Sequence, residues 1–106
     1  MIAVNVMYPN QADSTFNWDY YLSNHLDLVK KCWGPMGLKG ARVIKGVAGD
    51  EPDSDAPYLL IAQVLFDTVG EFEAAAAAHG EAIFGDVPNF TNIAPEVQVS
   101  EVLVDM

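Results

Sequence analysis

His25 is the side chain in this sequence that is best suited to chemistry. It lies in the middle of the run from Asp19 to Trp33, where apolar residues recur every three or four positions. That spacing predicts an amphipathic helix with the histidine on its apolar face. A histidine there could act as a general acid or base on a small organic ligand. The alternative is a buried neutral histidine held by two hydrogen bonds. The residues of the predicted face are Trp18, Leu22, His25, Val29 and Cys32.

Three polar residues in otherwise apolar stretches could support this histidine. Tyr21 lies one helical turn before it, and Asn5 and Gln63 lie within predicted strands. Such groups either converge in a ligand pocket or hold one another in place. We predict that they orient a substrate beside a catalytic His25, with some of the aromatic residues as walls. The predicted substrate-binding residues are Asn5, Tyr8, Tyr21, Trp33, Gln63 and His79.

The remaining metal-binding and nucleophilic side chains are few. His79 lies on the apolar face of an alanine-rich helix, where it could form the far wall of the same pocket or reach solvent. A metal site with both histidines would need a third ligand, and no acidic residue is spaced to provide one. Cys32 is the only cysteine, which we interpret as a small buried hydrophobe. Because no glycine-rich phosphate or dinucleotide motif is present, we expect no tightly bound redox cofactor, and without a third ligand we expect no metal.

The helices that carry both histidines alternate with four predicted strands. Apolar periodicity predicts strands over 2–8, 38–47, 58–66 and 96–104, and helices over 19–33 and 69–84. The order βαββαβ predicts one α+β, ferredoxin-like domain over residues 1–106, with a four-stranded antiparallel sheet and two helices on one face. The strand over 58–66 is apolar on both faces, so the second face also needs a cover. A second copy of the sheet is the simplest cover, which predicts a homodimer.

Composition restricts the kinds of partner. A chain of 106 residues with 51% hydrophobic and 19% charged residues is typical of one folded domain. Its net charge of −10 argues against binding to nucleic acid or to an anionic membrane. Without an apolar run of about 20 residues or a signal-peptide pattern, we expect a cytoplasmic protein. All five cations lie between positions 30 and 45, and Lys39, Arg42 and Lys45 could help to bind an anionic ligand.

The segment after the second predicted helix, GDVPNFTN over residues 85–92, is rich in turn-forming residues. We interpret Asp86 and Asn89 as turn residues, Pro88 as a constraint on the backbone and Phe90 as an anchor on the core. The segment could also form the rim of a pocket.

Three pieces of the sequence resemble the EthD family: Tyr21-x3-His25, Trp33-Gly34-Pro35 and the segment over 85–92. Asp27 stands where members of that family typically have a proline. The resemblance implies a dimeric α+β barrel, and it implies this fold more firmly than a reaction. Related barrel families include cofactor-independent monooxygenases, isomerases, cyclases, decarboxylases and haem-binding proteins, and the fold alone does not choose among them.

The residues and the resemblance together predict a small cofactor-independent enzyme that acts on a hydrophobic, aromatic or polyketide-like metabolite. His25 would transfer a proton in an oxygenase-like, lyase or isomerase reaction. The alternative is a non-catalytic dimer that binds a ligand or serves as an accessory protein in a degradation pathway. A closed and fully packed region around the histidine would instead indicate a structural role.

Overall fold

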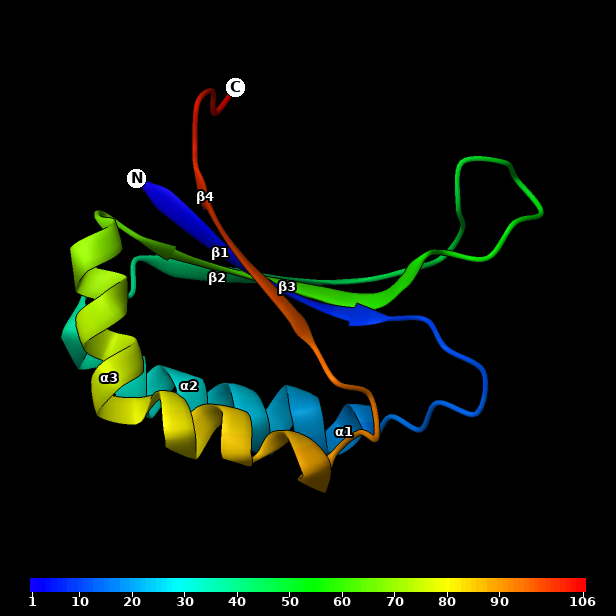
Figure 1. Cartoon of the computed structure of the whole chain (residues 1–106), viewed down its shortest axis with the longest axis horizontal. Coiled ribbons are helices and arrows are strands. Elements are labelled where there is room, and N and C mark those ends of the chain that lie inside the picture. The colour runs from blue at the N-terminus through cyan, green and yellow to red at the C-terminus, as the bar shows by residue number, and fades with distance from the viewer.

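A four-stranded antiparallel sheet carries both long helical segments on one of its faces (Figure 1). The elements are β1 (Ile2–Pro9), α1 (Trp18–Tyr20), η1 (Tyr21–His25), α2 (Leu26–Trp33), η2 (Gly34–Met36), β2 (Gly40–Lys45), β3 (Tyr58–Phe66), α3 (Val69–Gly85), η3 (Val87–Asn89) and β4 (Glu96–Glu101). The computed structural model describes residues 1–106. The strand order is β2-β3-β1-β4, and every neighbouring pair is antiparallel. The predicted α+β, ferredoxin-like architecture is therefore confirmed.

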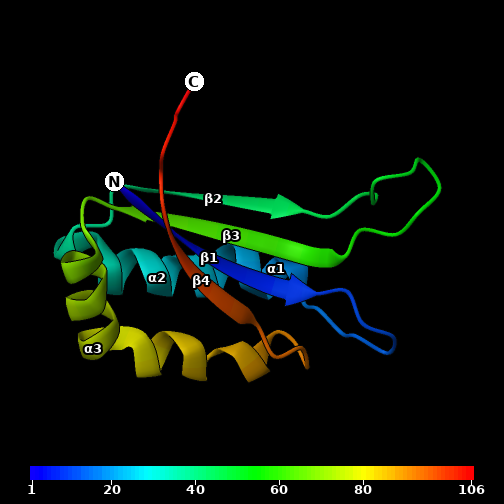
Figure 2. The same cartoon turned by 45° about the horizontal axis from the view of Figure 1, so that its top comes forward.

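Side chains of the two central strands alternate between the faces of the sheet. Figure 2 shows these strands, β3 and β1, between the edge strands β2 and β4. Their even-numbered residues face the helices, where Val4 lies opposite Val64 and Val6 lies opposite Ala62. The odd-numbered neighbours point to the other face. In β1 and β3, even-numbered residues thus lie on the helix side of the sheet and odd-numbered residues on the other side.

The first long helical segment, residues 18–33, contains one wide turn near its start. Asn17 caps the segment, because its Oδ1 accepts a hydrogen bond from the backbone N–H of Tyr20 at 3.1 Å. The next turn, η1, is π-helical, so its backbone hydrogen bonds span one residue more than those of an α-helix. The helix predicted over 19–33 is therefore present but irregular.

The π-helical turn changes which residues face the sheet. Buried positions recur every four residues, at Tyr21, His25 and Val29. Leu22, which the sequence predicts on the buried face, is 56% exposed. That part of the prediction is wrong because it assumes a regular 3.6-residue period through a turn that is wider.

The second long helix, α3, packs through small residues. Thr68 caps it, because its Oγ1 accepts a hydrogen bond from the backbone N–H of Glu71 at 3.1 Å. Ala75 and Gly80 are buried and allow the helix to approach its neighbours closely. The indole N–H of Trp33 donates to the backbone oxygen of Ala75 at 3.0 Å, which links the two helical segments. None of the helices combines the length and the apolar character needed to cross a membrane.

The last strand, β4, ends earlier than the strand predicted over 96–104. Its end at Glu101 lies directly opposite Ile2, the first residue of β1. One further backbone hydrogen bond follows, from the N–H of Val102 to the oxygen of Met1 at 3.1 Å. The chain then leaves the sheet (Figure 1), and Leu103 is 84% exposed.

The face of the sheet away from the helices is mainly apolar and carries one polar row. Leu59, Ile61 and Leu65 of β3 lie on this face and are half-buried. The polar row crosses all four strands in direct register and consists of Arg42, Gln63, Asn5 and Gln98. We call this side of the sheet the outer face.

Candidate functional site

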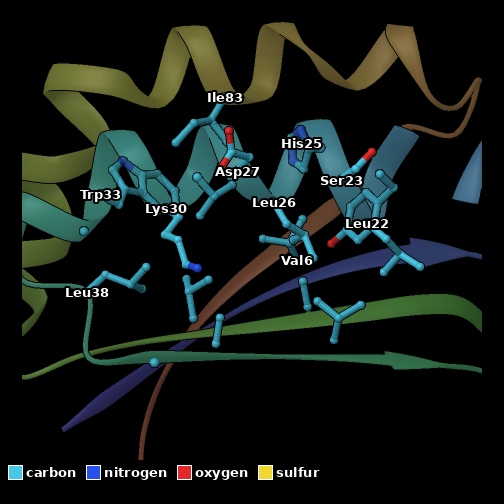
Figure 3. A pocket seen from close by; sticks show the side chains of 18 of the residues that line it. Val6, Leu22, Ser23, His25, Leu26, Asp27, Lys30, Trp33, Leu38 and Ile83 are labelled. Atoms are coloured by element: carbon cyan, nitrogen blue, oxygen red, sulfur yellow. The ribbon is translucent and has the colours of Figure 1, made fainter. Parts of the chain in front are cut away.

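A cavity of about 720 Å³ lies between the first helical segment and the sheet. Of its 21 lining residues, 14 are hydrophobic, so the interior suits an apolar ligand. Figure 3 shows this cavity, with the helix on one side and the strands on the other. The lining includes Val6, Tyr8, Val43, Ala62 and Val64 from the sheet and Tyr21, His25, Leu26, Val29 and Trp33 from the helix.

His25 is fixed in the wall of this cavity by contacts on several sides. The residue is 5% exposed, and its Nδ1 lies 3.0 Å from Oδ2 of Asp86. The ring stacks on Tyr21 with centroids 5.3 Å apart and lies 4.6 Å from the ring of Phe90. Because an ionised carboxylate only accepts hydrogen bonds, Nδ1 carries the hydrogen. In the neutral ring, Nε2 is therefore left with a free lone pair.

The second ring nitrogen of His25, Nε2, is neither bonded to the protein nor sealed inside it. It makes no hydrogen bond to the protein. Every side-chain nitrogen or oxygen that is sealed inside the protein has a hydrogen-bond partner. Nε2 has none, so it is not sealed. His25 is one of the residues that line the cavity. The histidine therefore keeps one ring nitrogen free of protein partners.

Asp86 is itself held by further hydrogen bonds. Its Oδ1 accepts from the hydroxyl of Tyr20 at 2.7 Å and from Nδ2 of Asn89 at 2.9 Å. Burial alone would raise the pKa of Asp86, but the hydrogen bonds from Asn89, Tyr20 and His25 outweigh it and lower this pKa below its ordinary value. The hydrogen bond to Asp86 in turn raises the pKa of Tyr20. At neutral pH the network therefore contains an ionised carboxylate and a protonated phenol.

The sequence interpretation of Asp86 as a turn residue misses its contact with His25. The turn role is also present, because the backbone N–H of Asn89 donates to the backbone oxygen of Asp86 at 3.0 Å. A signal was available: Asp86 follows α3 directly, and an acidic residue at the C-terminal end of a helix is unfavourable beside the helix dipole. An acid in that place needs a partner from elsewhere in the chain. Nothing in the sequence around Tyr20 indicates its hydrogen bond to Asp86.

Three of the predicted substrate-binding residues lie together with His25 in the cavity wall: Tyr8, Tyr21 and Trp33. Burial raises the pKa of both tyrosine hydroxyls, and for Tyr8 the neighbouring Tyr21 adds to the effect. These hydroxyls make no hydrogen bond to the protein, yet neither is sealed from solvent. They are thus free to bind a polar group of a ligand, whereas the indole N–H of Trp33 is already bonded to Ala75.

The other three predicted substrate-binding residues are not brought to His25. Asn5 and Gln63 face each other across β1 and β3, but they lie on the outer face of the sheet. The prediction that they support His25 is wrong, because their odd strand positions point away from the helices. His79 is half-buried on α3 and does not line the cavity, so its predicted role there is also wrong. No three histidine, cysteine, aspartate or glutamate side chains gather into a metal-binding group.

The histidine and the aspartate together can transfer a proton. Asp86 orients the ring of His25 and stabilises the positive charge that the ring acquires when Nε2 accepts a proton. The two free tyrosine hydroxyls can hold an oxygen atom of a ligand. An apolar cavity with a few convergent polar groups is the usual form of a small-molecule site.

The fold is that of the ferredoxin-like α+β proteins. The candidate site of this protein consists of a histidine–aspartate pair beside an apolar cavity. The family model of the EthD domain matches residues 10–94. The chain belongs to the EthD family, whose members are part of the dimeric α+β barrel superfamily. The family that the sequence resembles is thereby confirmed.

Solved structures agree with this assignment. An EthD-like protein from Ralstonia eutropha JMP134 is 36% identical, with a TM-score of 0.91 over 99% of this chain and 94% of that chain. An ethyl tert-butyl ether D (EthD) family protein from Bacillus halodurans C-125 is 16% identical, with a TM-score of 0.67 over 97% and 99%. A dimeric ferredoxin-like protein from an uncultured marine organism is 9% identical, with a TM-score of 0.55 over 100% and 98%. The last two comparisons concern the fold alone. No curated protein matches the sequence.

Proposed function

We propose that this protein binds a small, flat, hydrophobic metabolite in the cavity and that His25 transfers a proton to or from it. The observation that carries this proposal is the setting of the imidazole ring. Its Nδ1 lies 3.0 Å from Oδ2 of Asp86, while Nε2 has no protein partner beside the cavity. A base held in this way presents its accepting atom to the ligand.

The proton transfer follows from the tautomer of His25. Nε2 takes a proton from an acidic C–H or O–H bond of the ligand, and the electron pair of that bond stays on the ligand as an enolate or phenolate. Return of the proton to a different carbon completes an isomerisation, and loss of a leaving group from the anion completes a lyase reaction. In an oxygenase-like reaction, dioxygen oxidises the anion, and one oxygen atom enters the ligand while the other ends in water.

The walls of the cavity favour an aromatic or polyketide-like ligand. Its volume of about 720 Å³ lies within the range of roughly 300–1,000 Å³ that is usual for small-molecule sites. Tyr8, Tyr21 and Trp33 offer flat aromatic surfaces, against which ring systems pack well. The tyrosine hydroxyls supply hydrogen bonds for a carbonyl or phenolic oxygen.

Proton transfer to a bound ligand can be measured by NMR in D₂O. A thermal-shift screen of aromatic and polyketide-like metabolites first identifies a stabilising ligand. We expect the wild-type protein to accelerate exchange of an acidic C–H of that ligand for deuterium, and His25→Gln to slow the exchange by about 10²- to 10⁴-fold. His79→Gln is the matched control, since this histidine lies outside the cavity, and it should exchange at the wild-type rate. An unchanged rate in His25→Gln would remove this histidine from the mechanism.

A second candidate function is ligand binding without chemistry, in a dimer that sequesters a pathway intermediate. The largely apolar lining favours it, because burial of an apolar ligand needs no proton transfer. A metabolite that stabilises wild type and His25→Gln equally, with no deuterium exchange in either, would indicate this function.

We also infer that two copies associate through the outer face. Apolar side chains of β3 such as Ile61 and Leu65 are only half-buried there, and Ile44 of β2 is 46% exposed. An apolar sheet face of this kind is stable in water when a second sheet covers it, and a two-fold axis supplies an identical one. Sedimentation of the wild-type protein at micromolar concentration should give twice the mass of the chain. A monomer under these conditions would contradict the inference.

A further inference from the structure

One cation at the cavity has no acidic partner. Lys30 lines the cavity and makes no ion pair and no hydrogen bond. The other charged residues of the rim are neutralised, since Nζ of Lys39 lies 3.4 Å from Oδ2 of Asp67, and Oδ2 of Asp27 lies 3.5 Å from Nζ of Lys31. The rim therefore carries one uncompensated positive charge.

The side chain of Lys30 extends from α2 toward the sheet, on the same side of the helix as the cavity (Figure 3). Its methylene groups can cover part of the apolar lining while the ammonium group stays at the rim. Lys30 follows His25 by five positions, which corresponds to about 7.5 Å along a helix axis. Five positions also correspond to a rotation of about 140° around the axis, so Lys30 reaches toward the sheet while His25 leaves the helix on another side.

The charge of the whole chain makes this rim unusual. The protein carries a formal charge of −10, and all five cations lie between positions 30 and 45. Lys30 and Lys39 of that stretch both line the cavity. An acidic protein repels anions over most of its surface, so a local positive charge defines where an anionic ligand can bind.

We propose that the ligand of this cavity is an amphipathic acid: a flat apolar ring system with one carboxylate, whose anion binds Lys30 while the rings lie against the apolar lining of the cavity. This inference rests on the proposed function, in which the cavity is the ligand site, and it adds the charge class of the ligand. Apolar burial provides most of the affinity, and Lys30 provides the preference for the acid over a neutral analogue.

Two probes that differ only in charge test this inference, namely 2-naphthoate and 2-naphthamide, with affinities measured by isothermal titration calorimetry. We expect the wild-type protein to bind the naphthoate about fivefold more tightly than the amide, as for an exposed charge pair. Lys30→Met should abolish this preference without weakening the amide. Lys45→Met is the matched control, because this lysine neither lines the cavity nor pairs with an acid, and it should keep the preference. Lys30→Arg retains the charge and should keep most of it.

The outcomes separate this inference from the function on which it rests. Equal affinities of the wild-type protein for both probes would overturn the anion preference alone, since the cavity would still be a site for flat apolar ligands. An equal loss of preference in Lys30→Met and Lys45→Met would overturn the role of Lys30 as well, because it would indicate a general field effect. No binding of either probe would overturn the ligand site itself, and this inference with it.

Discussion

The two faces of the sheet differ in what covers them, although the same four strands form both. On the helix side, Leu60 and Phe66 are 0% exposed, and a cavity lined in part by His25 lies between helix and sheet. On the outer face, Ile61 and Leu65 are only half-buried, and no helix lies on that side of the sheet (Figure 1). One face is completed within the chain, and for the other we propose that a second copy is the cover.

This difference shows how one short sheet can present two independent surfaces, one to the cavity and one to the outside. Because side chains alternate along a strand, neighbours such as Asn5 and Val6 contribute to different surfaces. Val6 lines the cavity, whereas Asn5 belongs to the polar row of the outer face. A change on one face can therefore alter ligand binding or association separately.

The largest expected difference between the faces concerns stability. Leu60→Ala removes a fully buried side chain and should lower the free energy of unfolding by about 2–5 kcal/mol. Ile61→Ala, one position further along β3, should lower it by about 1 kcal/mol in dilute protein, since that side chain remains partly hydrated. Urea denaturation of both variants measures the two values. Equal losses would mean that the outer face is as well covered as the helix face.

The next effect concerns the carboxylate beside His25. Asp86→Asn replaces an obligate acceptor by an amide, so Nδ1 no longer has to carry the hydrogen and Nε2 can lose its lone pair. We expect deuterium exchange of a bound ligand to slow by about 10²-fold or more, with little change in ligand affinity. Asp53→Asn is the control, because this exposed acid lies in the loop between β2 and β3 and does not line the cavity. Full exchange activity in Asp86→Asn would exclude the proposed tautomer.

The same carboxylate also sets a dependence of stability on pH. Hydrogen bonds lower the pKa of Asp86 in the folded protein relative to the unfolded chain. Its contribution is therefore fully present above the unfolded pKa of about 4 and is lost as the pH falls through the folded pKa. Denaturation from about pH 6 to about pH 2 should show a smaller loss of stability for Asp86→Asn than for wild type. Parallel curves would contradict this contribution.

The order of elements and the position of His25 on a buried helix face could be predicted, because both depend on local periodicity. Leu22 could not be placed correctly, since a π-helical turn shifts the period without a clear signal in the sequence. The contact between His25 and Asp86 joins residues 61 positions apart, so no local pattern contains it.

The positions of Asn5 and Gln63 could not be predicted for a different reason. The strand over 58–66 is apolar on both faces, so alternation alone does not reveal which face the helices cover. Only the packing of α2 and α3 decides this, and it leaves the polar row outside. Asn5 lies in direct register with Gln63, so both belong to the same polar row on the outer face.

A smaller effect concerns the start of the helix that covers the cavity. Asn17→Ala removes the cap of the first helical segment and should lower the free energy of unfolding by about 1 kcal/mol. Asn17→Asp keeps an acceptor at the same place and should restore most of it. Because the outer face is not involved, sedimentation of both variants should match that of wild type. A change in association would mean that the two faces are coupled.

The smallest expected effect concerns Gln63 in the middle of the polar row. The side chain makes no hydrogen bond within its own chain, so Gln63→Leu should change the free energy of unfolding of dilute protein by less than about 0.5 kcal/mol. If two outer faces pack together, the amide meets polar groups of the second copy, and its loss leaves them without a partner. The dimer dissociation constant should then rise about threefold, as expected for a weak hydrogen bond. Gln11→Leu is the control, since this glutamine lies in an exposed loop away from the sheet. An unchanged dissociation constant in Gln63→Leu would place the polar row outside the contact between subunits.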